Sequence, residues 1–131
     1  MITEDYVTLE IAKLLKEKGF DERVKSYYAE SGLEGYMLAL RATKNTELRD
    51  GFISRPTFQM AMKWLREVHK IHISVEIGFD IDNPQYYFFV PSVCRFSDKS
   101  GEYESPFDEK EFNTYEEACE AAIMYCLEKL I

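Results

Sequence analysis

The chain has 131 residues, of which 46% are hydrophobic and 15% aromatic, and its formal net charge is −8. This composition excludes an intrinsically disordered protein, and the length predicts one domain over residues 1–131. Residues 97–131 carry 3 basic and 10 acidic side chains and so contribute −7 of the charge. Because phosphate binding needs clustered Lys and Arg, this balance disfavours nucleic acid as a partner.

The beginning of the chain, MITEDYVTLE, has neither a basic region nor an apolar run, so we expect no secretory signal and no transit peptide. No stretch approaches the roughly 18 apolar residues of a membrane span, so we expect no membrane partner. The three cysteines are irregularly spaced, which is typical of reduced thiols rather than of a disulfide framework. The sequence therefore predicts a cytoplasmic protein.

The first predicted element is a helix in TLEIAKLLKEKGF, whose apolar residues recur at helical spacing. Thr8 is placed to cap its start, and Gly19 stands where a residue with positive φ often ends a helix. Two β-prone runs, VKSYYAE and GYMLAL, lie on either side of a turn at 31–35 and predict a hairpin. The polar segment ATKNTELRDGF is then predicted to be a connector.

The stretch SRPTFQMAMKWLREVHKIHISVEI changes its hydrophobic period halfway. With Ser54 as the N-cap and Pro56 in the first turn, its first half predicts a helix over 56–70. From Ile71 onward, strict alternation predicts a half-buried strand. We therefore expect a helix that runs into a strand almost without a loop.

A second hairpin is predicted from this strand, the loop GFDIDNPQ and the returning strand YYFFVPSVCRF. Pro91 favours an edge position or a bulge, because proline cannot donate to a ladder. The acidic segment SDKSGEYESPFDEKEF is the best candidate for a mobile loop. NTYEEACEAAIMYCLEKLI predicts a last helix with Thr114 and Glu117 as a capping box. The order is α-ββ-α-ββ-α, which predicts an α+β fold of antiparallel hairpins packed against helices.

His69 and His72 invite a metal interpretation, in which only Glu76, two positions along the same strand face, could join them from the local sequence. Zinc needs three or four converging ligands. The incomplete set favours a histidine at a helix C-terminus and an exposed strand residue, so we expect no metal and no other cofactor. The segment from Asp80 to Asn83 begins like a calcium loop but lacks the glycine and glutamate that follow in an EF-hand.

The sequence contains no phosphate-binding loop, no nucleophile elbow and no carboxylate pair on a recognisable scaffold, so no catalytic residue is expected. Cys119 and Cys126 lie about 10.5 Å apart along one predicted helix, which is beyond disulfide reach, and both fall on its apolar stripe. Cys94 has no basic or histidine neighbour except Arg95, whose side chain should point to the opposite strand face. Catalysis by cysteine is therefore not expected.

Four consecutive aromatic residues, Tyr86, Tyr87, Phe88 and Phe89, are the main surplus of the sequence. Because a strand has two faces, one pair must leave the core unless a helix or a dimer partner covers it. Exposed aromatic pairs are a common basis of binding patches, and they can also stack unpaired bases. A second layer built by the last helix or by a partner remains the structural alternative.

The blocks IAKLLKEKGF, PTFQMAMKWLREVHKIHISV and TYEEACEAAIMYCLEKLI, in this order, resemble a group of small uncharacterised proteins from gut Bacteroidetes bacteria and their phages or mobile elements. The resemblance covers nearly the whole chain. It implies a cytoplasmic location and a mobile-element origin, and it brings no activity and no site residues with it.

Two hypotheses follow from these features. The first is a non-enzymatic protein that acts through contacts with another protein or with its own copy, using the aromatic residues at 86–89 and the acidic last quarter of the chain. The alternative is a nucleic-acid-binding regulator that uses the basic face of the helix at 56–70, formed by Lys63, Arg66 and Lys70.

Overall fold

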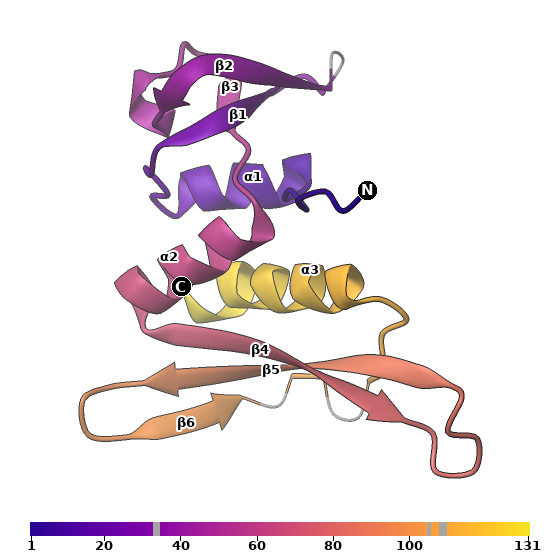
Figure 1. Cartoon of the computed structure of the whole chain (residues 1–131). Helices are drawn as coiled ribbons and strands as arrows, with labels where there is room; N and C mark the ends of the chain where they lie inside the picture. Colours follow the sequence, from indigo (N-terminus) through magenta and orange to yellow (C-terminus); the bar gives the residue numbers. More distant parts are fainter. Residues whose placement is uncertain (33–34, 105, 108–109) are drawn as a thin grey trace. The chain divides into compact units, whose positions relative to one another are not determined.

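A computed structural model describes residues 1–32, 35–104, 106–107 and 110–131. Within these residues the chain forms the predicted α+β fold, with three α-helices and two three-stranded antiparallel sheets (Figure 1). The elements divide into two compact units, Met1–Ala61 with Ile131 and Met62–Leu130. The boundary falls inside the second helix, and the expectation of one domain stays a prediction. No helix among the described residues combines the length and the apolar character that crossing a membrane requires.

Helix α1 (Leu9–Glu17) begins and ends where the sequence predicts. The side-chain oxygen of Thr8 accepts the N–H of Ile11 at 3.2 Å. Gly19 has a φ of +95°, which glycine adopts easily because it lacks a Cβ. The N–H of Phe20 then donates to the carbonyl of Leu15 at 2.8 Å and closes the helix end.

The first sheet has the strand order β2-β1-β3 and consists of β1 (Val24–Ala29), β2 (Tyr36–Thr43) and β3 (Phe52–Ser54). The predicted hairpin of β1 and β2 is confirmed, and Leu33 and Glu34 of its turn lie outside the described residues. The connector expected at 42–52 is partly wrong. It contains a 3-10 turn at Asn45–Glu47 and the start of β3, which pairs with β1. A strand of three residues is too short for alternation to reveal it.

A buried asparagine ties the end of α1 to β3. Asn45 is 8% exposed; its amide nitrogen donates to the carbonyl of Phe20 at 2.8 Å, and its oxygen accepts the N–H of Ser54 at 2.8 Å. Beside it, the Asp21 carboxylate accepts the N–H and the hydroxyl of Thr46, and the bond from the N–H is the main cause that lowers the pKa of Asp21. These bonds fix a segment whose sequence shows only polar residues.

Arg55 lies between two tyrosine rings next to this sheet. Its guanidinium carbon is 3.8 Å from the ring centroid of Tyr6 and 3.8 Å from that of Tyr36. One terminal nitrogen donates to the buried hydroxyl of Ser26 at 3.0 Å. Because Arg55 belongs to the segment after β3 and its partners to three other segments, it cross-links the first unit by a cation–π stack.

Helix α2 (Phe58–His69) begins at Phe58 rather than in the predicted turn at Pro56. The hydroxyl of Thr57 accepts the N–H of Met60 at 3.1 Å. Thr57 is therefore the cap, and the expectation of Ser54 as N-cap is wrong because Ser54 pairs within β3.

The direct junction of helix and strand is confirmed. Lys70 alone separates α2 from β4 (Ile71–Phe79), and it turns the chain with a φ of +57°. Its carbonyl accepts the N–H of Phe96 at 3.0 Å, which fixes the first residues of the strand. A side chain in this left-handed region costs roughly 1–2 kcal/mol.

The second sheet has the order β4-β5-β6 and consists of β4, β5 (Tyr87–Phe96) and β6 (Gly101–Glu104). The predicted second hairpin is confirmed, with an unbroken register between β4 and β5. The expectation of a mobile loop at 97–112 is wrong for its centre, because 101–104 form β6 against β5. Ser105, Asp108 and Glu109 of that segment lie outside the described residues.

Pro91 lies in the central strand β5, opposite Val75, without a bulge. The expectation of an edge position or a bulge is therefore wrong for this strand. At Pro91, however, the side of β5 that faces away from β4 has no paired strand among the described residues. The N–H of Phe89 donates away from β4 to the carbonyl of Phe112, and alternation places the ring nitrogen of Pro91 on the same side. Pairing with β6 begins only at Val93, so the missing N–H falls in a gap.

Helix α3 (Tyr115–Tyr125) continues into a π-helical turn at Cys126–Leu130. The hydroxyl of Thr114 accepts the N–H of Glu117 at 3.1 Å, which is one of the two bonds of the predicted capping box. The buried stripe consists of Ala118, Cys119, Ala122, Ile123, Cys126 and Leu127. Both cysteines are thus core residues, and burial raises the pKa of the Cys126 thiol to about 12.

Candidate functional site

One face of β4 passes from the core to solvent along the strand. Ile71 and Ile73 are 2% and 7% exposed, whereas Ile77 and Phe79, on the same face, are 53% and 56% exposed. Figure 1 shows that the β4–β5 hairpin extends beyond the N-terminal end of α3. The helix therefore covers only the first part of an apolar face that continues past it.

The four aromatic residues singled out in the sequence are divided between different surroundings. The ring of Phe89 meets the ring of Tyr115 in α3 edge-to-face, with centroids 6.1 Å apart. Tyr87 meets Phe89 in the same way at 6.1 Å but remains 58% exposed, and Tyr86 is 62% exposed. The last helix thus covers one of the four side chains, and the two tyrosines face solvent.

Phe88 points to the opposite face of the sheet, where it stands across from Gly78. A Cβ at Gly78 would lie 2.5 Å from Cε2 of Phe88. The glycine therefore leaves the space that this ring occupies, and Phe88 does not join Tyr87 and Phe89 on the α3 side.

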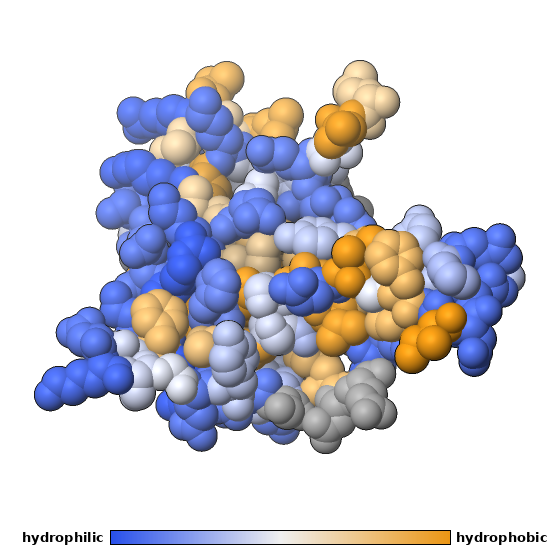
Figure 2. Space-filling model, turned by 60° about the horizontal axis from the view of Figure 1, so that its bottom comes forward, coloured by the Kyte–Doolittle hydropathy of each residue, from blue (hydrophilic) through white to orange (hydrophobic). Residues whose placement is uncertain are grey.

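The exposed apolar group at the end of this hairpin is called the distal cluster here, and it consists of Ile77, Phe79, Ile81, Tyr86 and Tyr87. Each member is at least 53% exposed, and Ile81 in the loop reaches 96%. Figure 2 shows hydrophobic residues gathered where the distal end of the hairpin lies. Sequence reasoning found the two tyrosines but missed the isoleucines and Phe79, because it could not tell where the helix stops.

The loop beside the cluster is closed by an aspartate. The Asp80 carboxylate accepts the backbone N–H groups of Asp82 and Asn83 at 2.8 and 3.0 Å. This is an Asx turn, the ordinary hairpin chemistry of such residues. Asp80 and Asp82 therefore place two negative charges at the rim of the cluster.

The structure does not bring the metal candidates together. The ring of His69 contacts Trp64 edge-to-face at a centroid distance of 4.7 Å, while His72 lies exposed on β4. At the rise of a strand, Glu76 lies about 13 Å farther along. In the described parts of the chain, no three His, Cys, Asp or Glu side chains are grouped closely enough to hold a metal ion.

Cys94 has a neighbour that the sequence did not reveal. The register places His72 directly opposite Cys94 across β4 and β5, and Tyr103 opposite it across β5 and β6. The expectation of no histidine neighbour is therefore wrong, because cross-strand contacts depend on register. The thiol of Cys94 faces the backbone carbonyl of Arg95 at 3.7 Å, and no group among the described residues orients the imidazole for catalysis.

The basic face proposed for nucleic acid is solvated. Lys63 and Lys70 are exposed and Arg66 is half-buried, and none of them has an ion-pair partner among the residues that the structure describes. The unit that contains them, Met62–Leu130, has 7 basic and 14 acidic side chains, a net −7, whereas the first unit has 9 and 10. The nucleic-acid alternative stays a prediction, without a feature that distinguishes it from a solvated helix face.

We find no family model, curated protein or solved structure that matches this chain. Inference about function therefore depends on the surfaces described above. Of these, the distal cluster is the one on the second sheet where apolar side chains gather without cover from the described residues.

Proposed function

We propose that this chain is a non-enzymatic protein that acts through protein contacts, and that its distal cluster binds a second copy of the chain. The observation that supports this is the continuous apolar face of β4, which is buried under α3 at Ile71 and exposed at Phe79. A soluble monomer rarely leaves a contiguous apolar face of this kind uncovered.

The exposed area is close to what a dimer needs. Aromatic side chains bury about 150–250 Å² each, so the five partly exposed members of the distal cluster offer on the order of 700 Å² per copy. A standard interface buries about 800 Å² per partner. Two copies related by a two-fold axis would cover one another's clusters with the same residues.

The charge of the second unit opposes this association but does not prevent it. Two copies of the second unit, each with a net charge of −7, repel each other at low salt. At 0.15 M salt the Debye length is about 8 Å, so most of this repulsion is screened. Self-association should therefore strengthen as salt is raised. Binding to nucleic acid or to a basic protein would weaken instead.

Location and origin belong to the same proposal. Cys94 and Cys126 are free thiols, and a reducing compartment such as the cytoplasm suits them. A phage or mobile-element origin rests on the sequence resemblance alone.

Sedimentation velocity from low to high micromolar concentration tests the proposal. We expect a monomer–dimer equilibrium with a Kd on the order of 10–100 µM, which tightens between about 50 and 300 mM NaCl. Phe79→Glu should weaken it at least about tenfold, because a carboxylate would be buried without a partner.

Tyr103→Glu is the matched control. Tyr103 is 73% exposed in the same sheet, and it pairs with Cys94 on the opposite face from Phe79. It adds the same charge and should leave the equilibrium within about twofold. A wild-type protein that stays monomeric at the highest concentration, or equal weakening by both variants, would refute the proposal.

A further inference from the structure

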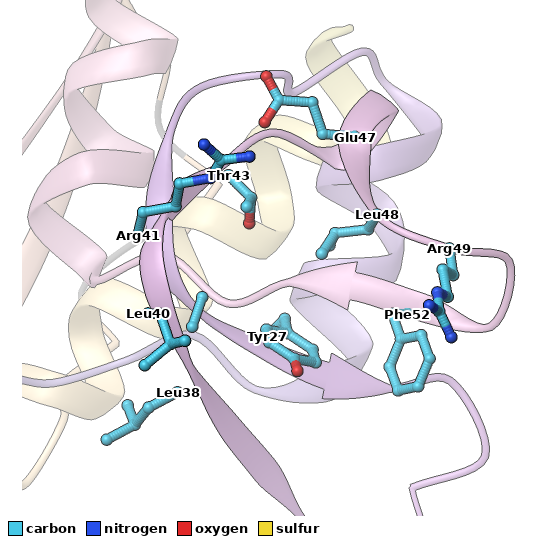
Figure 3. A pocket seen from close by; sticks show the side chains of 10 residues that line it. Tyr27, Leu38, Leu40, Arg41, Thr43, Glu47, Leu48, Arg49 and Phe52 are labelled. Atoms are coloured by element: carbon cyan, nitrogen blue, oxygen red, sulfur yellow. The ribbon is translucent and has the colours of Figure 1, made fainter.

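The first sheet carries a hollow on its open face, of about 450 Å³. Its floor is formed by Tyr27 and Phe52, whose rings meet edge-to-face with centroids 5.5 Å apart (Figure 3). Ile53, the next residue in β3, is 1% exposed, and alternation directs Phe52 to the opposite side. The hollow therefore lies on the sheet face that is not part of the core.

A bulge in the edge strand builds one wall. Val24 pairs with Thr43 and Ser26 pairs with Leu38, so residues 39–42 of β2 stand opposite the single residue Lys25 of β1. Bulges of this kind redirect side chains, and this one places two residues at the rim, Leu40, which is fully exposed, and Arg41. The other wall consists of Leu48 and Arg49 after the 3-10 turn.

The rim is positively charged although the protein is acidic. The carboxylate of Glu47, which also lines the hollow, is held by Arg23 at 2.9 Å, with a second contact at 3.1 Å. Arg41 and Arg49 have no ion-pair partner among the described residues. An apolar floor with two unpaired guanidinium groups at its rim complements a ligand that is apolar in the middle and anionic at its sides.

We propose that this hollow binds an extended acidic peptide segment of a partner protein. An apolar side chain would lie on the rings of Tyr27 and Phe52, and carboxylates two residues before and after it, on the same face of the extended peptide, would bind Arg41 and Arg49. The adjacent edge favours a peptide over a small molecule. The order β2-β1-β3 leaves the outer edge of β2 without a strand partner among the described residues, so an extended backbone can pair there.

The test uses three end-blocked, fluorescently labelled hexapeptides and measures anisotropy with the full chain. One has the sequence Ser-Glu-Ser-Phe-Ser-Glu, which places Phe and both Glu side chains on one face of an extended backbone, the second replaces Glu by Lys, and the third replaces Phe by Ser. We expect only the first to bind, with a Kd on the order of 10–100 µM that weakens as salt is raised. Binding of the Lys peptide with similar affinity, or no binding of the Glu peptide at millimolar concentration, would overturn the proposal.

Variants locate the site. Arg41→Glu combined with Arg49→Glu should weaken binding of the Glu peptide at least about tenfold. Leu40→Ser, which removes a fully exposed side chain that the fold does not need, should weaken it about threefold.

The control is Lys13→Glu combined with Lys63→Glu, which changes the net charge by the same amount at exposed positions outside the hollow. If this pair weakens binding of the Glu peptide equally, the effect comes from net charge alone, which would contradict the proposal. Full competition by octanoate, a small carboxylate without a peptide backbone, would contradict the peptide as the occupant.

Discussion

Each unit contains a helix followed by three antiparallel strands, but the second unit also contains α3, and the two units arrange their strands differently. In the first sheet the central strand is β1, the first in sequence, whereas in the second it is β5, the middle one. The similarity in order is therefore not a repeat of one fold. The difference shows that a helix and a hairpin leave open which side of the hairpin a third strand joins.

The units also differ in what holds them together. The first unit has polar side chains that cross-link segments far apart in the sequence, above all the buried Asn45 and the half-buried Arg55. In the second unit, long strand pairing dominates, with one hydroxyl pair, Ser74 and Ser92, at 2.6 Å between the strands. Substitutions at polar positions should therefore be most costly in the first unit, and steric changes in the second.

The largest effect is expected at Asn45. Asn45→Ala leaves the carbonyl of Phe20 and the N–H of Ser54 buried without their partner, which should lower the free energy of unfolding by about 2–4 kcal/mol. Urea unfolding measures it. Asn113→Ala, at an exposed position, should change stability by less than about 0.5 kcal/mol. A loss below about 1 kcal/mol for Asn45→Ala would contradict the claim that this polar cross-link stabilises the first unit.

The next effect is expected at Arg55. Arg55→Lys keeps the charge but loses the planar group between Tyr6 and Tyr36 and its bond to Ser26, so we expect a loss of about 1–3 kcal/mol. Thermal unfolding by circular dichroism measures it. Arg49→Lys is the matched control, with no ring contact, and should be nearly neutral. Equal melting temperatures for the two variants would mean that charge alone matters at Arg55.

In the second unit, a steric change at Gly78 is expected to be destabilising. Gly78→Ala places a methyl group where the Phe88 ring lies, so we expect a loss of about 1–2 kcal/mol from overpacking. In a Phe88→Ala background the same substitution should cost almost nothing. A double-mutant cycle by urea unfolding measures this coupling, and strictly additive effects would show that the ring moves away freely.

The smallest effect is a gain. Lys70→Gly relieves the positive φ at the junction of α2 and β4, and after the added entropy of the unfolded chain we expect about 0.5–1 kcal/mol of stabilisation. Lys70→Ala keeps the strain and should not stabilise. If both variants stabilise equally in chemical unfolding, the lysine side chain rather than its backbone is unfavourable.

The sequence predicted the features that depend on local signals. The helices, the two hairpins and the junction at Lys70 follow from periodicity, caps and turn residues that lie within a few positions of one another. The third strand of each sheet was missed because β3 and β6 are short and lack alternation. Their pairing partners lie far away in the sequence.

The candidate site was predicted only in part, for the same reason. Tyr86 and Tyr87 stood out as surplus aromatics, but Ile77 looked like a core residue until the end of α3 was located, and Phe79 fell in the predicted loop GFDIDNPQ. The hollow of the first sheet depends on a bulge, and no local pattern indicates where a register shifts. The sequence resemblance does not indicate which residues pair across the strands either.

Hydrogen exchange of the full chain at low and high protein concentration tests self-association through the distal cluster. If the second unit associates through its distal cluster, the amides of residues 76–87 should exchange more slowly as the concentration rises, and those of 36–40 in the first sheet should not change. Exchange that is independent of concentration in 76–87, or protection that appears in 36–40 instead, would contradict self-association through the end of the β4–β5 hairpin.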